Sequence, residues 1–253
     1  MKKITIIANW KMSLSLHESI QLAEDVERGL PPLPASLRVF LCPSFTALPS
    51  VQPLLRQCLL GAQDVFWENR GAYTGEIAPS MLTDLGCHAV ILGHSERRAY
   101  CGETSLMVHR KVQTALANNL TPIVCVGETA EERDRGQKEH VVIEQLTSAL
   151  SGIDEKKEQD IFVVYEPVWA IGNGHVVAPE DAEQMHQLIL HTLREMYSPA
   201  YLDAHVQVLY GGSVDRRSVG PLISMPHVGG CLVGTASWHA HNFLSIIDAA
   251  LRI

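Results

Sequence analysis

Short runs of apolar, often β-branched residues recur along the chain, with more polar stretches between them. Eight such runs are read as strands, at residues 5–8, 37–42, 59–62, 89–92, 122–126, 161–165, 206–210 and 230–233. Apolar residues fill most positions of these runs instead of every second one, which is typical of strands buried on both faces. The runs therefore predict an all-parallel sheet covered by helices.

Longer amphipathic stretches separate the strand runs, and each is long enough for a helix. They lie at residues 16–30, 104–118, 138–150, 180–196 and 243–251. Eight strand units in about 250 residues are typical of the (β/α)8 TIM barrel, which we expect to occupy residues 1–253 as one catalytic domain. The competing fold is an open doubly wound sheet with a glycine-rich fingerprint after its first strand. Here Asn9-Trp10-Lys11 follows that strand instead.

Composition narrows the class of protein. The 253 residues are 46% apolar and 19% charged, which suits one large buried core. No apolar run approaches the roughly 20 residues needed to cross a bilayer. A net charge of −8, with no basic run longer than two residues, argues against a nucleic-acid partner. Six cysteines without CxxC spacing predict reduced thiols, so we expect a cytoplasmic protein.

Polar residues gather where the strand runs end, the face of a barrel that carries active sites. They are Asn9, Lys11, Gln63, Asp64, His94, Ser95, Glu128, Glu166 and the segments 211–213 and 234–237. The two glycine-containing segments follow the last two strands, where barrels often bind phosphate, although each would also serve as a turn. The connection at residues 64–80 is unusually long, and long loops within compact domains usually have a function.

Glu166 is the candidate base. It follows the buried run 161–165, so its carboxylate should emerge partly desolvated at the rim of the barrel, where it can accept a proton. The alternative is that Glu166 forms an ordinary salt bridge at the end of the strand. The segment 167–174 that follows is apolar, with Pro167 near its start and glycines near its end, a composition that suits a lid with hinges.

His94 and Lys11 are candidate electrophiles. Ser95 is expected to cap a short helix with Glu96 in its first turn, and a histidine facing that helix start is favoured in its neutral, hydrogen-bond-donating form. Lys11 is the lysine placed directly after a strand, where with Asn9 it could hold an anion. The alternatives are a structural histidine and a solvated surface lysine.

These residues fall in segments that resemble the triosephosphate isomerase family. The segments are ANWKM at residues 8–12, GAYTGE at 71–76, GHSERR at 93–98, YEPVWAIG at 165–172 and YGGSV at 210–214. They occur in the family's order and span essentially the whole chain. The resemblance implies interconversion of dihydroxyacetone phosphate and glyceraldehyde 3-phosphate, a step of glycolysis and gluconeogenesis.

The resemblance also implies a role for each candidate. Glu166 would move the proton, His94 would polarise the carbonyl and Lys11 with Asn9 would hold the charged substrate; this family is itself a standard example of a neutral histidine electrophile. Phosphate would be bound around Gly172, Ser213, Gly234 and Thr235. Ser95 and Glu103 would be supporting residues, Glu103 behind Lys11 or His94. No metal or organic cofactor is implied, and a homodimer would form through the 64–80 loop with Thr74, Gly75 and Glu76 at its tip.

Three positions depart from the family pattern: Thr235 and Gly229 replace other residues, and residues 173–175 differ at the end of the lid. If the backbone at Thr235 requires a positive φ, a β-branched residue there is strained. Three other functions compete with this one, and the last of them stays open. A Schiff-base aldolase would need a lysine inside the barrel, and the later strand runs contain none. A phosphosugar sensor would lack the base or the electrophile, whereas Glu166 and His94 are both present. An isomerase of four-carbon sugar phosphates would differ around the phosphate.

Overall fold

The computed structural model describes residues 2–172 and 177–253. Its strands are β1 (Ile4–Asn9), β2 (Leu37–Cys42), β3 (Leu59–Ala62), β4 (Ala89–Leu92), β5 (Thr121–Val126), β6 (Ile161–Tyr165), β7 (Val206–Tyr210) and β8 (Gly230–Val233). They pair in parallel in sequence order, and β8 pairs with β1, so the barrel is closed. The predicted (β/α)8 barrel is confirmed, and six of the eight predicted strands match residue for residue.

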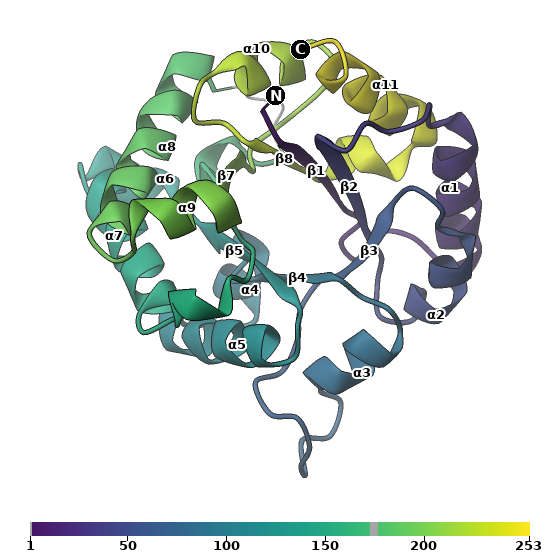
Figure 1. Cartoon of the computed structure of the whole chain (residues 1–253), viewed down its shortest axis with the longest axis horizontal. Coiled ribbons are helices and arrows are strands. Elements are labelled where there is room, and N and C mark those ends of the chain that lie inside the picture. The colour runs from purple at the N-terminus through teal and green to yellow at the C-terminus, as the bar shows by residue number, and fades with distance from the viewer. Residues whose placement is uncertain (1, 173–176) are drawn as a thin grey trace.

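Helices surround the ring of strands (Figure 1). They are α1 (Leu16–Gly29), α2 (Leu48–Val51), α3 (Pro79–Asp84), α4 (Ser95–Tyr100), α5 (Ser105–Ala117), α6 (Ala130–Asp134), α7 (Lys138–Leu150), α8 (Pro179–Arg194), α9 (Pro199–His205), α10 (Val219–Ser224) and α11 (Ala240–Ala250). The described residues also form four short 3-10 helices, η1 (Gln52–Leu54), η2 (Glu155–Lys157), η3 (Val168–Ala170) and η4 (Thr235–Trp238). Within the described residues, no helix combines the length and the apolar character needed to cross a membrane.

Two apolar layers explain why the strand runs lack alternation. Ile7 of β1 points into the barrel, where it packs with side chains such as Phe40, Phe162 and Leu232. Its neighbour Ile6 belongs to the other layer, between the strands and the helices. Since both faces of each strand are buried, apolar side chains occupy consecutive positions. The barrel interior is thus filled, and a ligand must bind at one of its ends.

The connection between β3 and α3 extends away from the barrel (Figure 1). Its base is held by the Phe66 ring, which stacks on Trp67 with centroids 4.1 Å apart and contacts Tyr73 at 4.6 Å. The Phe66 N–H donates to the Ile77 carbonyl at 2.8 Å, which brings the two ends of the projection together. Residues 71–76 at the far end are all exposed.

Candidate active site

A cavity of about 390 Å³ opens at the carboxyl ends of the strands. Seven of the candidate site residues line it: Asn9, Lys11, His94, Gly172, Ser213, Gly234 and Thr235. The closed parallel topology brings them together, because every strand end of a barrel reaches the same face. Lys11 is the one lysine or arginine among the described lining residues.

Glu166 lies in the wall behind this cavity and is only 1% exposed. One carboxylate oxygen, Oε2, accepts the Ser95 backbone N–H at 2.9 Å, and the other, Oε1, lies 3.1 Å from His94 Nε2. A Cβ on Gly211 would come within 2.9 Å of Glu166 Cγ, so glycine there leaves room for the carboxylate. Burial raises the pKa of the adjacent Cys125 thiol, which therefore stays neutral beside it.

His94 is the N-cap of α4: its Nδ1 accepts the Glu96 backbone N–H at 3.3 Å. The prediction that Ser95 caps this helix is wrong, because Ser95 is its first helical residue and donates its N–H to Glu166. A nitrogen that accepts a hydrogen bond carries no proton, so in this arrangement Nε2 bears the proton of a neutral ring. That proton is available to Glu166 or to a ligand in the cavity.

Lys11 has a φ of 52°, in the left-handed region that lysine rarely adopts. Its N–H donates to Asn9 Oδ1 at 3.0 Å, and Gln63 Nε2 donates to its carbonyl oxygen at 2.8 Å. Its Nζ lies 2.6 Å from Glu96 Oε1. A backbone held in an unfavourable conformation at a cavity is a common sign of a functional residue.

The loops after β7 and β8 form the opposite wall, near the start of the candidate lid. Ser213 Oγ donates to the Ala170 carbonyl at 2.8 Å, and Gly172 has a φ of 74°. Thr235 begins η4 and is absent from the described non-glycine residues with positive φ, so the strain considered for it does not arise. Residues 173–175, the end of the candidate lid, lie outside the described part of the chain.

Comparisons with known proteins extend over nearly the whole chain. The family model described as triosephosphate isomerase matches residues 4–250. The chain belongs to the triosephosphate isomerase family. Curated relatives of that name include one from Herpetosiphon aurantiacus, 46% identical over 98% of this chain and 99% of the relative. Another, from Thermus thermophilus, is 42% identical over 99% of this chain and 100% of the relative.

The family resemblance implies that Glu103 supports Lys11 or His94 from behind, and the structure places its carboxylate against the backbone that leads into His94. Glu103 Oε2 accepts the N–H of Gly93 at 3.1 Å, and its described side-chain contacts include neither Lys11 nor His94. Gly93 directly precedes His94 and has a φ of 70°. Glu103 therefore fixes the backbone that carries the histidine, not the ring itself.

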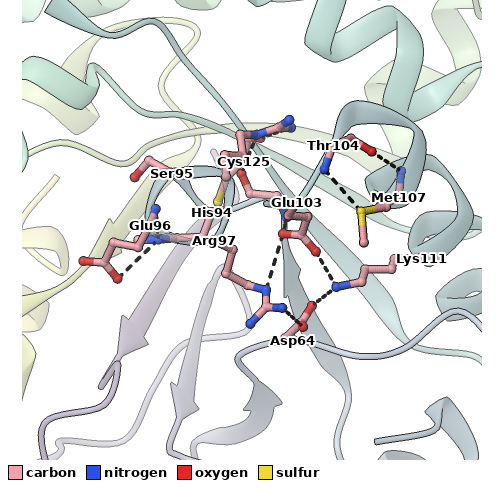
Figure 2. Close-up of polar contacts among 12 residues, drawn as sticks. Asp64, His94, Ser95, Glu96, Arg97, Glu103, Thr104, Met107, Lys111 and Cys125 are labelled. Carbon is pink, nitrogen blue, oxygen red and sulfur yellow. Dashed lines mark hydrogen bonds and ion pairs between the residues drawn. The ribbon is translucent and has the colours of Figure 1, made fainter. Parts of the chain in front are cut away.

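A buried charge cluster surrounds Glu103 (Figure 2). Lys111 forms ion pairs with Glu103 and with Asp64, the latter at 2.6 Å, and Arg97 Nη2 lies 2.8 Å from the other Asp64 oxygen. Lys111 is 3% exposed, although its place on a helix gave no sign of burial. The cluster joins the start of the 64–80 loop to the helix that follows His94.

The sequence marks Glu128 only as a polar residue after a strand. It is fully buried, accepts the Trp169 indole N–H at 2.9 Å and the Tyr165 hydroxyl at 3.1 Å, and lies 3.7 Å from Arg133 Nη1. Trp169 belongs to the candidate lid. Glu128 therefore holds the first half of that segment against the barrel.

Proposed function

We propose that this protein is a triose-phosphate isomerase, which interconverts dihydroxyacetone phosphate and D-glyceraldehyde 3-phosphate through an enediolate. The observation that carries the proposal is a buried carboxylate, Glu166, held beside His94 Nε2 at the edge of a cavity that contains Lys11. Membership of the triosephosphate isomerase family supports the same substrates. The reaction needs a base next to a carbonyl and donors for the oxygen that becomes negative.

Glu166 would be the base that carries the proton between the two carbons. In the described conformation it is held by the Ser95 N–H and is absent from the lining of the cavity, so it must turn toward the bound substrate to react. Its burial keeps bulk water away from the carboxylate. Proton removal then leaves an enediolate whose charge needs stabilisation.

His94 and Lys11 would supply that stabilisation. The neutral imidazole can donate from Nε2 to a substrate oxygen, since Nδ1 is already an acceptor. The ammonium of Lys11, now 2.6 Å from Glu96, would exchange that carboxylate for the substrate's charge. Ser95 would act as a supporting residue by holding Glu166 until substrate arrives.

The phosphate would be bound by backbone N–H groups around Gly172, Ser213, Gly234 and Thr235, with Asn9 completing the pocket floor beside Lys11. Backbone amides bind phosphate well in such loops. No metal or organic cofactor enters this scheme. We place the whole reaction in one catalytic domain, residues 1–253, acting in the cytoplasm.

A direct assay tests the function. Purified protein should interconvert the two triose phosphates far faster than it acts on tetrose phosphates offered at the same concentration, because the cavity is compact and ends at the phosphate loops. A clear preference for a tetrose phosphate would assign the four-carbon reaction instead. Absence of turnover with intact folding and with bound sugar phosphate would favour a sensor.

We further propose a homodimer built on the 64–80 loop, with Thr74, Gly75 and Glu76 at its tip. Two apolar side chains near the cavity end of the molecule support it: Met12 is 97% exposed and Tyr100 is 84% exposed. Apolar surface of this kind often marks an interface. Sedimentation should give a dimer, and Tyr100→Glu should weaken it while the control Ile253→Glu should not. A fully active monomer would reject the proposal.

A further inference from the structure

A second hollow lies beside the substrate cavity. Its volume is about 400 Å³, and it shares Asp215, Ala236 and Asn242 with the lining of the substrate cavity. Arg216 and Arg217, from the connection between β7 and α10, also line it. A ligand that approaches the phosphate loops from this side passes these two guanidinium groups first.

Both arginines carry charge that the described residues do not neutralise by ion pairing. They are exposed and form no ion pair with a described carboxylate, unlike Arg28 with Asp25 and Arg252 with Asp248 elsewhere on the surface. The two guanidinium groups therefore leave an excess of positive charge at the edge of the cavity, partly offset by Asp215, whose carboxylate interacts with the charge of Arg217.

Asp215 is the one described carboxylate that lines the second hollow. Its Oδ1 accepts the backbone N–H groups of Arg217 and Ser218, both at 2.8 Å. The Ser218 N–H, the largest influence, and the Arg217 N–H lower the pKa of Asp215, so it stays ionised and bound to the backbone. The hollow therefore presents two cations against one carboxylate.

This excess of positive charge stands out on a chain whose formal net charge is −8. An acidic protein repels an anionic substrate over most of its surface, so a local cationic site decides where that substrate approaches. Fields of this kind act over a Debye length of about 8 Å at physiological ionic strength. A site next to the phosphate loops lies within useful range of them.

We propose that Arg216 and Arg217 form a capture site for phosphorylated substrates at the outer edge of the active-site cavity. The inference rests on the proposed function. The two guanidinium groups attract the phosphate dianion and pass it to the loops around Ser213 and Gly234. They act on encounter with free substrate and take no part in the proton transfer at Glu166.

Kinetics of a charge-matched pair of variants test the capture site. Arg216→Gln/Arg217→Gln removes the two cations, and Lys156→Gln/Lys157→Gln removes two exposed cations from η2, before β6 and so at the opposite end of the barrel. Both variants change the net charge equally. Each is assayed for kcat and kcat/KM with triose phosphate from low to high ionic strength, after its unfolding temperature has been compared with that of the wild type.

The arginine variant should lose roughly three- to tenfold in kcat/KM at low salt, should approach the wild type at high salt and should keep its kcat. The lysine variant should follow the wild type throughout. Equal behaviour of the two variants would overturn the capture site, as would a loss that persists at high salt. A wild type without triose phosphate turnover would instead overturn the proposed function, so the two failures are distinguishable.

Discussion

The two ends of the barrel each contain a hollow, and the larger one is at the end without the catalytic candidates. It measures about 510 Å³ against about 390 Å³ for the substrate cavity. Three of its charged or titratable groups pair with one another: Arg38 Nη1 lies 2.8 Å from Asp160, and His205 Nδ1 lies 3.2 Å from the same carboxylate. The volume of a hollow therefore does not identify the candidate active site.

The smaller hollow differs in how its polar groups are held. Lys11 is in a left-handed conformation, and the buried Glu166 leaves Oε1 without a well-aligned hydrogen bond among the described residues. Buried polar atoms are usually paired, so an exception beside a cavity suggests a ligand as the partner. The comparison predicts that substitutions at the carboxyl end of the strands affect chemistry, and that those at the amino end affect stability.

The largest effect in the comparison should come from Lys11. Lys11→Met should lower kcat/KM by roughly 10²- to 10³-fold without unfolding the protein, since it removes the cation of the cavity. Lys3→Met, which removes a lysine lining the opposite hollow, is the matched control and should keep normal activity. Steady-state kinetics of both variants check this. Near-normal turnover by Lys11→Met would return Lys11 to the role of a surface charge.

Shortening the base should have the next largest effect. Glu166→Asp keeps the carboxylate but withdraws it by one methylene, a displacement of about 1 Å that can cost roughly 10²-fold in rate. The loss should appear mainly in kcat, because substrate binding depends on other groups. A variant that raises KM while kcat is unchanged would mean that Glu166 serves binding instead.

The third effect is on stability, and it comes from the layer of side chains between the strands and the helices. His186 is fully buried on α8, with Nδ1 3.1 Å from the His227 carbonyl oxygen, and burial lowers its pKa from 6.5 to about 4. The unfolded chain therefore binds the proton more readily, so stability present above about pH 6.5 is lost as the pH falls toward 4. At about pH 5 the loss from this group should be about 2 kcal/mol.

Urea denaturation at two pH values measures that contribution. His186→Gln should reduce the difference in unfolding free energy between neutral pH and about pH 5. The exposed His241→Gln should leave the difference as in the wild type. An unchanged acid dependence in His186→Gln would show that other groups cause it.

The smallest effect should come from Asp160 and its two ion-pair partners at the amino ends of the strands. Asp160→Asn removes the shared partner of Arg38 and His205, whose ion pairs are partly exposed and so contribute little. We expect kcat/KM within about twofold of the wild type and a loss of less than about 1 kcal/mol in unfolding free energy. Denaturant titration and an assay together check this. A large loss of activity would break the contrast between the two ends.

The fold can be predicted from the sequence because burial of a strand on both faces requires apolar residues at neighbouring positions. Consecutive apolar positions in β6, for example, follow directly from burial on both faces, and the run 161–165 was placed without error. The strand-end positions of Glu166, His94 and Lys11 then followed from topology alone, since a closed parallel barrel brings all carboxyl ends together.

Contacts between segments that are distant in the chain cannot be predicted from the sequence pattern. The burial of Lys111 depends on Asp64 and Glu103, which reach it from separate loops. Likewise, the hydrogen bond from the Ser95 N–H to Glu166, a residue from a distant segment, leaves no local pattern in the sequence. The backbone conformation of Thr235 is set by its place at the start of η4, and residue type alone could not reveal it.

Proton exchange with solvent tests the central claim, that Glu166 is the base, most directly. In deuterated water the wild type should place solvent deuterium on the carbon beside the carbonyl of its product, which mass spectrometry or NMR detects. Glu166→Gln keeps the shape of the side chain but cannot take up the proton, so it should neither isomerise nor exchange at a comparable rate. Near-normal deuterium incorporation by a folded Glu166→Gln variant would contradict the account.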